Sequence, residues 1–240
     1  MHEPLLVVRR GALGDTLLMI PVLRALRAQE PQRPLHFAGN LDFAVLLSHF
    51  GIVDRALSSE DLQLWRRPAP AGALVEGRDF DPRLGPECSR PAAEELLLRV
   101  RAARPALPCV DPVPRLLDSR RPLAPGHLRV LAPGAGAPRK RRPLAEFVAL
   151  ATAPRVAVVL GEAEREFARE VRAAMPGEVE YWQELPLVEL ATRLARAAEY
   201  FGNDSGITHL AACLLVPTTA MFVASDPRVW APRGDHVRVV

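Results

Sequence analysis

Short apolar runs alternate with longer segments of helical periodicity along most of this 240-residue chain. The runs predict strands, and apolar residues three or four positions apart predict helices. The predicted strands are Leu5–Val8, Leu35–Ala38, Leu128–Leu131, Val156–Leu160, Glu199–Phe201 and Thr218–Phe222. The predicted helices are Thr16–Ala28, Phe43–Phe50, Pro91–Ala103, Leu144–Ala153, Glu164–Met175, Leu187–Ala197 and Gly206–Cys213. This alternation predicts an α/β fold in which helices flank parallel sheets.

The alternation occurs twice, on either side of a proline-rich centre. The chain has 24 prolines, and they concentrate between Pro68 and Pro125. We therefore expect two Rossmann-like domains, residues 1–125 and 126–240, with Pro122–Gly126 as the linker. With 49% hydrophobic residues, the chain can bury a substantial core.

Composition removes several function classes. The formal net charge is only +3, aromatic residues make up 5%, and no recognised nucleic-acid motif is present, so we expect no nucleic-acid partner. The three cysteines, Cys88, Cys109 and Cys213, are too far apart for a metal pair or a disulfide framework, which suits a reducing cytoplasm. No apolar run approaches the roughly 18 residues of a membrane span, and charges interrupt the apolar segment near the N-terminus. These features predict a cytoplasmic protein.

Three loops that follow predicted strands carry the candidate chemistry, because parallel sheets bind ligands at the carboxyl ends of their strands. The first is Gly11–Asp15. Gly11 and Gly14 allow a ligand or another backbone to come close, and Asp15 lies at a helix start. The alternative for Asp15 is a helix cap that accepts hydrogen bonds from backbone amides.

The second loop combines small residues with a cation. Gly134, Ala135 and Gly136 precede Lys140, which is the one lysine among 31 Lys and Arg residues. A lysine can contact a phosphate oxygen as a point charge. The alternative is a solvent-exposed basic run, Arg139–Arg142. The spacing is neither GxxxxGK[ST] nor GxGxxG, so a P-loop or a dinucleotide fingerprint is not predicted.

The third loop leads from a short strand into a helix. It contains Asp204, Ser205 and Gly206, and His209 lies in the first turn of the helix. The free amides and the dipole of a helix start favour a diphosphate. For His209 alone, a packed or surface histidine is the alternative.

Together the three loops resemble the bacterial heptosyltransferases, glycosyltransferase family 9. The runs that carry the resemblance are RRGALGDTLLMIPVLRALRAQEP (Arg9–Pro31), PGAGAPRKRRPLAEFVALA (Pro133–Ala151) and GNDSGITHLAACLLVPTTAMFVASDPRVWAP (Gly202–Pro232). The resemblance does not extend over Gln32–Gly126. The chain is shorter than a typical member, and we expect it to lack the last helix that crosses back to the first domain in this family. The resemblance implies a GT-B fold, two Rossmann-like domains facing a cleft.

The resemblance also implies a reaction. It is a metal-independent, inverting transfer of a heptose-like sugar from ADP-heptose or another nucleotide-activated donor to a lipopolysaccharide or other cell-surface glycan. Asp15 resembles the base that takes the acceptor proton, and Lys140 resembles the cation on the donor phosphates. The remaining residues of the second and third loops match the donor site. Glu162 and Glu164 both qualify as the ribose-binding carboxylate, and a salt-bridged helix surface is the alternative.

Two further expectations concern metal and activity. Asp79-Phe80-Asp81 has the DxD spacing of metal-dependent glycosyltransferases, but no strong strand precedes it, so chance is the preferred explanation. The six histidines are scattered, and no metal or cofactor is expected. The alternative function is a reduced GT-B module that binds a nucleotide, a nucleotide sugar or a partner protein without transferring anything. A glycolipid acceptor would bring the protein to the inner face of the cytoplasmic membrane.

Overall fold

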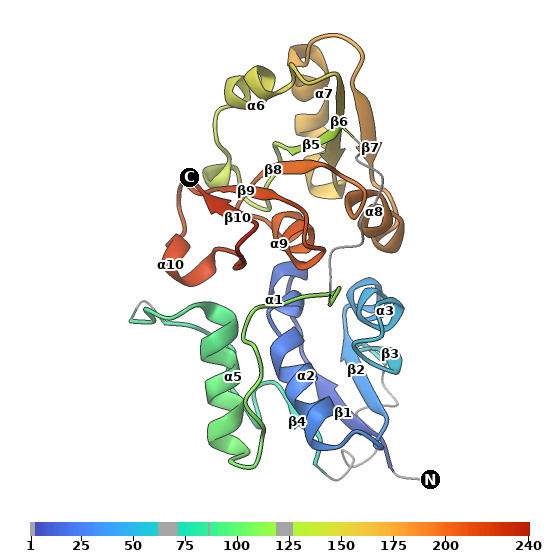
Figure 1. Ribbon diagram of the computed structural model, residues 1–240, viewed down its shortest axis with the longest axis vertical. Helices are drawn as coiled ribbons and strands as arrows, with labels where there is room; N and C mark the ends of the chain where they lie inside the picture. The colour runs from blue at the N-terminus through green and yellow to red at the C-terminus, as the bar shows by residue number, and fades with distance from the viewer. Residues whose placement is uncertain (1–2, 62–71, 86, 119–126) are drawn as a thin grey trace. The chain divides into compact units, whose positions relative to one another are not determined.

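Two α/β units make up the chain, Met1–Leu116 and Leu117–Val240, and each is built on its own parallel sheet (Figure 1). The computed structural model describes residues 3–61, 72–85, 87–118 and 127–240. The predicted linker Pro122–Gly126, and with it the domain boundary expected after residue 125, lies outside these residues. The predicted α/β class with two parallel sheets is confirmed.

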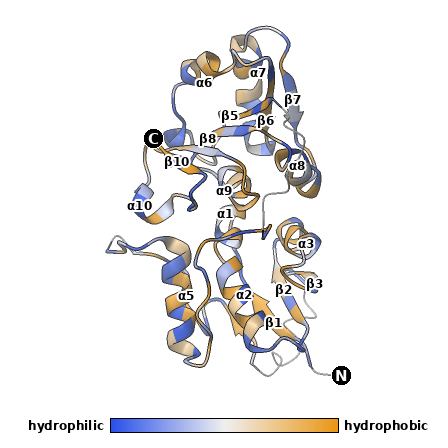
Figure 2. Ribbon diagram, in the orientation of Figure 1, coloured by the Kyte–Doolittle hydropathy of each residue, from blue (hydrophilic) through white to orange (hydrophobic). Residues whose placement is uncertain are grey.

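The first unit has a four-stranded sheet in the order β3-β2-β1-β4, in which all neighbours are parallel. Its strands are β1 (Leu5–Val8), β2 (Leu35–Gly39), β3 (Arg55–Ser58) and β4 (Leu74–Val75). Its helices are α1 (Leu13–Leu17), α2 (Ile20–Gln29), α3 (Leu41–His49) and α5 (Ala92–Ala103). The residues of β1 are hydrophobic (Figure 2), and all four are buried, as expected for a central strand covered on both faces.

The single helix predicted over Thr16–Ala28 is two helices in the structure. α1 ends at Leu17 and α2 begins at Ile20, so the chain turns between them. Pro21 lies in the first turn of α2 and has no N–H to continue the bonding of α1. Because α1 begins at Leu13, Gly14 and Asp15 lie inside its first turn and not in the loop before it.

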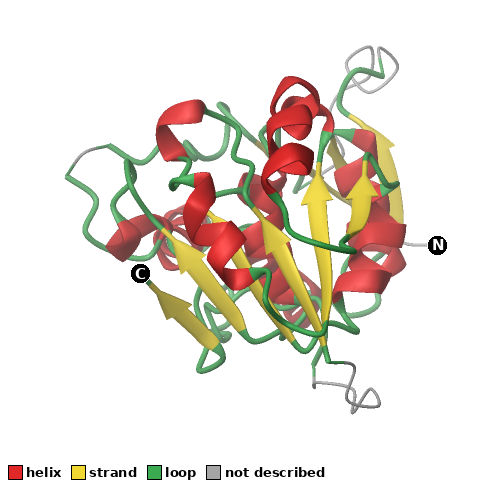
Figure 3. Cartoon of the chain, turned by 90° about the horizontal axis from the view of Figure 1, so that it is seen from above, coloured by secondary structure: helices red, strands yellow, loops and turns green. Residues whose placement is uncertain are grey.

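The second unit has a six-stranded parallel sheet in the order β10-β9-β8-β5-β6-β7, seen as arrows that point the same way in Figure 3. Its strands are β5 (Leu128–Ala132), β6 (Arg155–Leu160), β7 (Glu180–Gln183), β8 (Glu199–Asn203), β9 (Thr218–Met221) and β10 (Val237–Val239). Its α-helices are α6 (Leu144–Leu150), α7 (Arg165–Ala174), α8 (Leu187–Leu194), α9 (Gly206–Cys213) and α10 (Pro227–Trp230). Two short 3₁₀ turns are η1 (Pro138–Lys140) and η2 (Glu162–Glu164).

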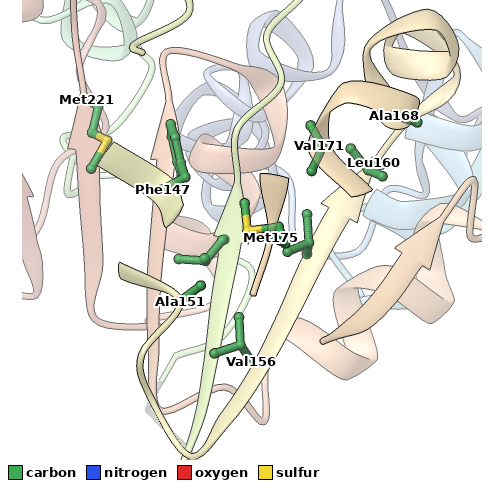
Figure 4. Packing of buried hydrophobic residues seen from close by; sticks show 10 residues of the cluster. Phe147, Ala151, Val156, Leu160, Ala168, Val171, Met175 and Met221 are labelled. Atoms are coloured by element: carbon green, nitrogen blue, oxygen red, sulfur yellow. The ribbon is translucent and has the colours of Figure 1, made fainter. Parts of the chain in front are cut away.

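Helices α6 and α7 bury an apolar core against β5 and β6 (Figure 4). Phe147 of α6 and Val171 of α7 are fully buried beside the strand residue Val158. Each such side chain contributes about 1.5–3 kcal/mol relative to an exposed position. This core fixes the strand ends from which the candidate site is built.

Each sheet has a topological switch point, which is the pair of neighbouring strands at which the strand order reverses. In the second unit it lies between β5 and β8, which pair Ala132 with Gly202 at their carboxyl ends. In the first unit it lies between β1 and β4, which pair Val8 with Val75. Ligands of open α/β sheets bind outside such points.

Among the described residues, no helix is both long and apolar enough to cross a membrane.

Candidate functional site

Lys140 and Asp204 meet at the switch point of the second sheet. Lys140 ends η1 in the loop after β5, and Asp204 directly follows β8. The Lys140 Nζ atom lies 2.7 Å from Asp204 Oδ2, and Ser225 Oγ donates to the same oxygen at 2.5 Å. Asp204 is buried, whereas the Lys140 side chain keeps 30% of its surface exposed. The structure therefore offers a partly exposed ammonium fixed by a buried carboxylate.

Asn203, the last residue of β8, joins this strand to the loop that carries Lys140. Its Nδ2 atom donates to Pro133 O at 2.8 Å and to Gly134 O at 3.4 Å. Its Oδ1 atom accepts from Arg142 N at 3.0 Å. One buried amide thus contacts both ends of the loop.

A buried hydroxyl network supports the turn from β8 into α9. Ser205 caps α9 by accepting from Thr208 N at 3.4 Å. Thr208 Oγ1 donates to Asn203 O and lies 3.0 Å from the Tyr200 hydroxyl. Burial raises the pKa of Tyr200 and outweighs the hydrogen bonds to Thr208 and Ser205 that would lower it. The phenol stays neutral and serves as part of the scaffold.

Of the two candidate ribose-binding glutamates, the structure brings only Glu164 to the loop after β5. Glu164 Oε2 accepts from Gly161 N at 2.9 Å, and a Cβ atom added to Gly134 would lie 2.6 Å from Glu164 Oε1. Glycine at position 134 is what permits this approach. The Glu162 side chain is 81% exposed and faces Arg165 at 3.6 Å.

The remaining donor-side candidates lie around the same strand ends. Ala135 is buried and Gly136 is exposed, and a Cβ atom added to Gly136 would meet no atom within 4 Å. Gly206 begins α9, and His209 in its first turn is buried. His209 thus packs within its unit, and its role at the donor site stays a prediction.

Asp15 lies at the corresponding edge of the first sheet and is held by two groups. Its Oδ2 atom accepts from Ala12 N at 3.0 Å, so Asp15 does cap α1, and its Oδ1 atom lies 3.4 Å from Arg9 Nη2. The Asp15 side chain keeps 34% of its surface exposed, so it is open to a reactant. A Cβ atom added to Gly11 would lie 2.8 Å from Asp15 Cβ, so glycine allows this close approach.

Arg9 is buried and also contacts Glu76, which follows β4. The Arg9 Nη1 atom donates to Glu76 Oε1 at 2.8 Å, and Arg10 N donates to Glu76 Oε2 at 2.5 Å. A chain of charges, Glu76–Arg9–Asp15, therefore crosses the switch point of the first sheet. Because a buried guanidinium is costly without a partner, the two carboxylates hold Arg9 in place.

Charged side chains of the basic run and of the DxD segment interact with nearby residues. In the basic run, Arg141 stacks on Phe167 at 4.6 Å and Arg142 pairs with Glu146 at 2.9 Å. In the DxD segment, Asp79 and Asp81 each pair with a neighbouring arginine, Arg78 at 2.7 Å and Arg83 at 2.8 Å. Across the described residues, no three His, Cys, Asp or Glu side chains gather in a group that could hold a metal ion.

Sequence reasoning passed over four residues of these two edges: Arg9, Glu76, Asn203 and Ser225. Arg9, Asn203 and Ser225 all stand inside the runs that carry the resemblance, and the position of Arg9 and Asn203 at strand ends was an available signal. Glu76 follows a two-residue strand in the proline-rich centre, where no pattern marked a strand end. Ser225 lies in the loop after β9, and only the fold brings that loop to Asp204.

Comparison with known proteins agrees with this fold. The family model described as glycosyltransferase family 9 (heptosyltransferase) matches residues 101–240. No curated protein matches the chain. Among solved structures, E. coli ADP-heptose LPS heptosyltransferase II is 21% identical with a TM-score of 0.77, over 99% of this chain and 90% of that one.

Two further structures are similar over nearly the whole chain. The family 9 glycosyltransferase from Veillonella parvula is 17% identical with a TM-score of 0.76, over 100% of this chain and 88% of that one. E. coli heptosyltransferase WaaC with ADP is 16% identical with a TM-score of 0.73, over 99% and 92%. These likenesses identify the fold as the GT-B type. By the family model, which spans more than half of its residues, the chain belongs to glycosyltransferase family 9, the heptosyltransferases.

Proposed function

We propose that this glycosyltransferase transfers a heptose-like sugar from a nucleoside-diphosphate donor to a cell-surface glycan, with inversion and without a metal ion. The observation that carries the proposal is the Lys140–Asp204 pair at the switch point of the second sheet. It lies beside the start of α9, whose amides favour phosphate. Solved relatives of this fold are described with ADP and with ADP-2-deoxy-2-fluoro heptose, which supports ADP as the carrier.

In this proposal the donor diphosphate contacts Lys140 and the amides at the start of α9. The bond between the anomeric carbon and the leaving phosphate oxygen breaks, and negative charge grows on the nucleoside diphosphate. The Lys140 ammonium offsets that charge, which is the task a divalent ion performs in other enzymes. Glu164 lies at the neighbouring strand end and would accept hydrogen bonds from the ribose hydroxyls.

The acceptor hydroxyl oxygen forms the new bond to the anomeric carbon, from the face opposite the leaving group. Its proton passes to Asp15, which acts as the general base. Ala12 N and Arg9 each contact one oxygen of Asp15 and so orient the carboxylate. The side chain is also partly exposed, so it stays open to a substrate. A glycolipid acceptor would require peripheral contact with the inner face of the cytoplasmic membrane.

Calorimetric titration tests the donor half of the proposal. Wild type, Lys140→Ala and Arg139→Ala are titrated with ADP, UDP, GDP and ADP-heptose in the presence of a metal chelator. We expect binding by wild type and a loss of about tenfold or more in Lys140→Ala, because a charge-assisted contact contributes roughly 1.5–3 kcal/mol. Arg139 is an exposed cation on the same loop and serves as the matched control. Absence of all nucleotide binding would favour a partner-protein module instead.

Asp15→Asn tests the transfer half, because asparagine keeps an oxygen that can accept from Ala12 N. We expect unchanged donor affinity and a fall in product formation of about 10²–10⁴-fold, the usual worth of a positioned base. Product is measured with ADP-heptose and a library of glycan and glycolipid acceptors. Equal turnover by Asp15→Asn and wild type would remove Asp15 as the base. Binding without product from any acceptor would favour a non-catalytic nucleotide module.

A further inference from the structure

Asn203 holds the loop that carries Lys140 from both sides. Its side chain is fully buried, donates to the carbonyls of Pro133 and Gly134, and accepts from the amide of Arg142. These partners lie in the segment between β5 and α6, 61 to 70 positions away in sequence.

The loop has little structure of its own to fix Lys140. Its one regular element is η1, a single 3₁₀ turn closed by Lys140 N to Ala137 O at 3.0 Å and Arg141 N to Pro138 O at 3.0 Å. Both bonds are local to the turn, and such turns are weak. The position of Lys140 relative to the sheet therefore depends on how the ends of the loop are attached.

The residue after Asn203 is Asp204, the partner of Lys140. Adjacent residues of one strand end thus perform two tasks: Asn203 fixes the loop backbone, and Asp204 receives the ammonium that the loop presents. A side chain at position 203 must donate to the carbonyls of Pro133 and Gly134 and accept from the amide of Arg142. An amide can do both, whereas an ionised carboxylate only accepts and a hydrocarbon side chain does neither. Burial raises the importance of this match, because an unpaired backbone group there has no water to replace its partner.

We infer that Asn203 is a positioning residue for the diphosphate site: it sets the span between the β5 loop and β8 and so places the Lys140 ammonium against Asp204. The inference rests on the proposed function only for the identity of the ligand. The placement of Lys140 itself is a property of the chain and can be measured without any nucleotide.

The first measurement uses the fact that Lys140 is the only lysine of the chain. An amine-acylating reagent modifies Lys140, and peptide mapping by mass spectrometry separates it from the N-terminal amine. In ligand-free Asn203→Ala we expect the acylation rate at Lys140 to rise about fivefold or more, since losing even one of the three hydrogen bonds of Asn203, at roughly 1 kcal/mol, changes a population about fivefold. The control is Asn40→Ala, which removes the other asparagine, a cap on α3 in the first unit. Equal acylation rates in Asn203→Ala and wild type would overturn the inference.

The second measurement is a double-mutant cycle on ADP affinity with Asn203→Ala and Lys140→Ala. If Asn203 acts through Lys140, Asn203→Ala weakens ADP binding about tenfold in wild type and much less when Lys140 is already alanine. The same loss in both backgrounds would show a general structural effect and overturn the inference. If wild type binds no nucleotide, the proposed function fails, and the acylation rates alone decide the role of Asn203. Thermal unfolding checks that Asn203→Ala is folded, and Asn203→Asp, which keeps the acceptor for Arg142, replaces it if it is not.

Discussion

At the scale of single residues, several buried polar side chains lie at the carboxyl ends of the two sheets. Arg9, Asn203, Asp204 and His209 are all buried there. Burying such groups is costly unless each finds a partner, so their partners are part of what defines the two edges. This explains why Arg9 spans two carboxylates and why Asp204 receives both an ammonium and a hydroxyl.

Glu76→Ala tests the first of these arrangements. The substitution leaves the buried Arg9 with one carboxylate and removes the acceptor of Arg10 N. We expect the free energy of unfolding of the first unit to fall by about 1–3 kcal/mol, measured by urea denaturation. Asp81→Asn breaks an exposed pair with Arg83 and is expected to leave stability unchanged. A Glu76→Ala protein as stable as wild type would show that Arg9 needs no second partner.

The cysteines should differ sharply in reactivity. Burial raises the pKa of Cys213 to about 12, whereas Cys109 is exposed. Because the thiolate is the nucleophile, and a raised pKa keeps the thiol protonated until the pH approaches that value, Cys213 should resist iodoacetamide at pH 8. Cys109 should be alkylated under the same conditions, and Cys213 only after denaturation. Mass spectrometry of the digested protein checks both, and rapid labelling of Cys213 in the native state would contradict its burial.

At the scale of elements, the connection from β8 into α9 shows why a helix start needs support beneath it. The first turn of α9 presents amides, and its position depends on Ser205 and on Thr208, which lies under the turn against Tyr200. Thr208 is fully buried, so its hydroxyl bonds cannot be replaced by water. The rest of α9, from Leu210 to Cys213, is buried in the unit.

Thr208→Val tests this support with little change in side-chain shape. It removes the Thr208 hydroxyl that bonds the carbonyl of Asn203 and the Tyr200 hydroxyl, and leaves Tyr200 with Ser205, so we expect a loss of about 1–3 kcal/mol in unfolding free energy. The control is Thr192→Val, which removes a hydroxyl bonded to a helix carbonyl at an exposed position of α8. Thermal and urea unfolding measure both variants. Equal small effects in the two variants would mean that the Thr208 network is not needed for stability.

At the scale of the whole molecule, the candidate site residues belong to two sheets, one in each unit. The charges around Asp15 belong to Met1–Leu116, and the charges around Lys140 belong to Leu117–Val240. The contacts described above for each edge join residues of the same unit. A ligand of one edge should therefore stabilise one unit first.

Hydrogen exchange on adding ADP tests this division. We expect slower amide exchange in the loop after β5 and in the first turn of α9, and unchanged exchange in α2 and α5 of the first unit. The expected protection follows from binding free energy, which stabilises the region that holds the ligand. Lys140→Ala should show reduced protection at the same ADP concentration. Protection confined to the first unit would place the nucleotide at the wrong edge for our proposal.

The sequence by itself determined the class of the fold and the loops worth attention. Apolar runs such as Leu5–Val8 and Val156–Leu160 are buried in the structure, and their local pattern sufficed to predict them as strands. The resemblance of the loop sequences was also local, and the family is confirmed. Strands β3, β4, β7 and β10 escaped prediction because they are short or partly exposed, so pairing with a neighbour makes them strands, not their own pattern.

Only the tertiary structure decided which residues share an edge. Strand order is set by how helices cover the sheet, and it brings together residues 67 positions apart in the Arg9–Glu76 pair and 70 positions apart at Asn203 and Pro133. The same packing distinguishes Glu164 from Glu162, two residues away, because only one of them faces Gly134. Periodicity in sequence reports which side of an element is buried, whereas contacts between distant strand ends depend on the arrangement of the whole sheet.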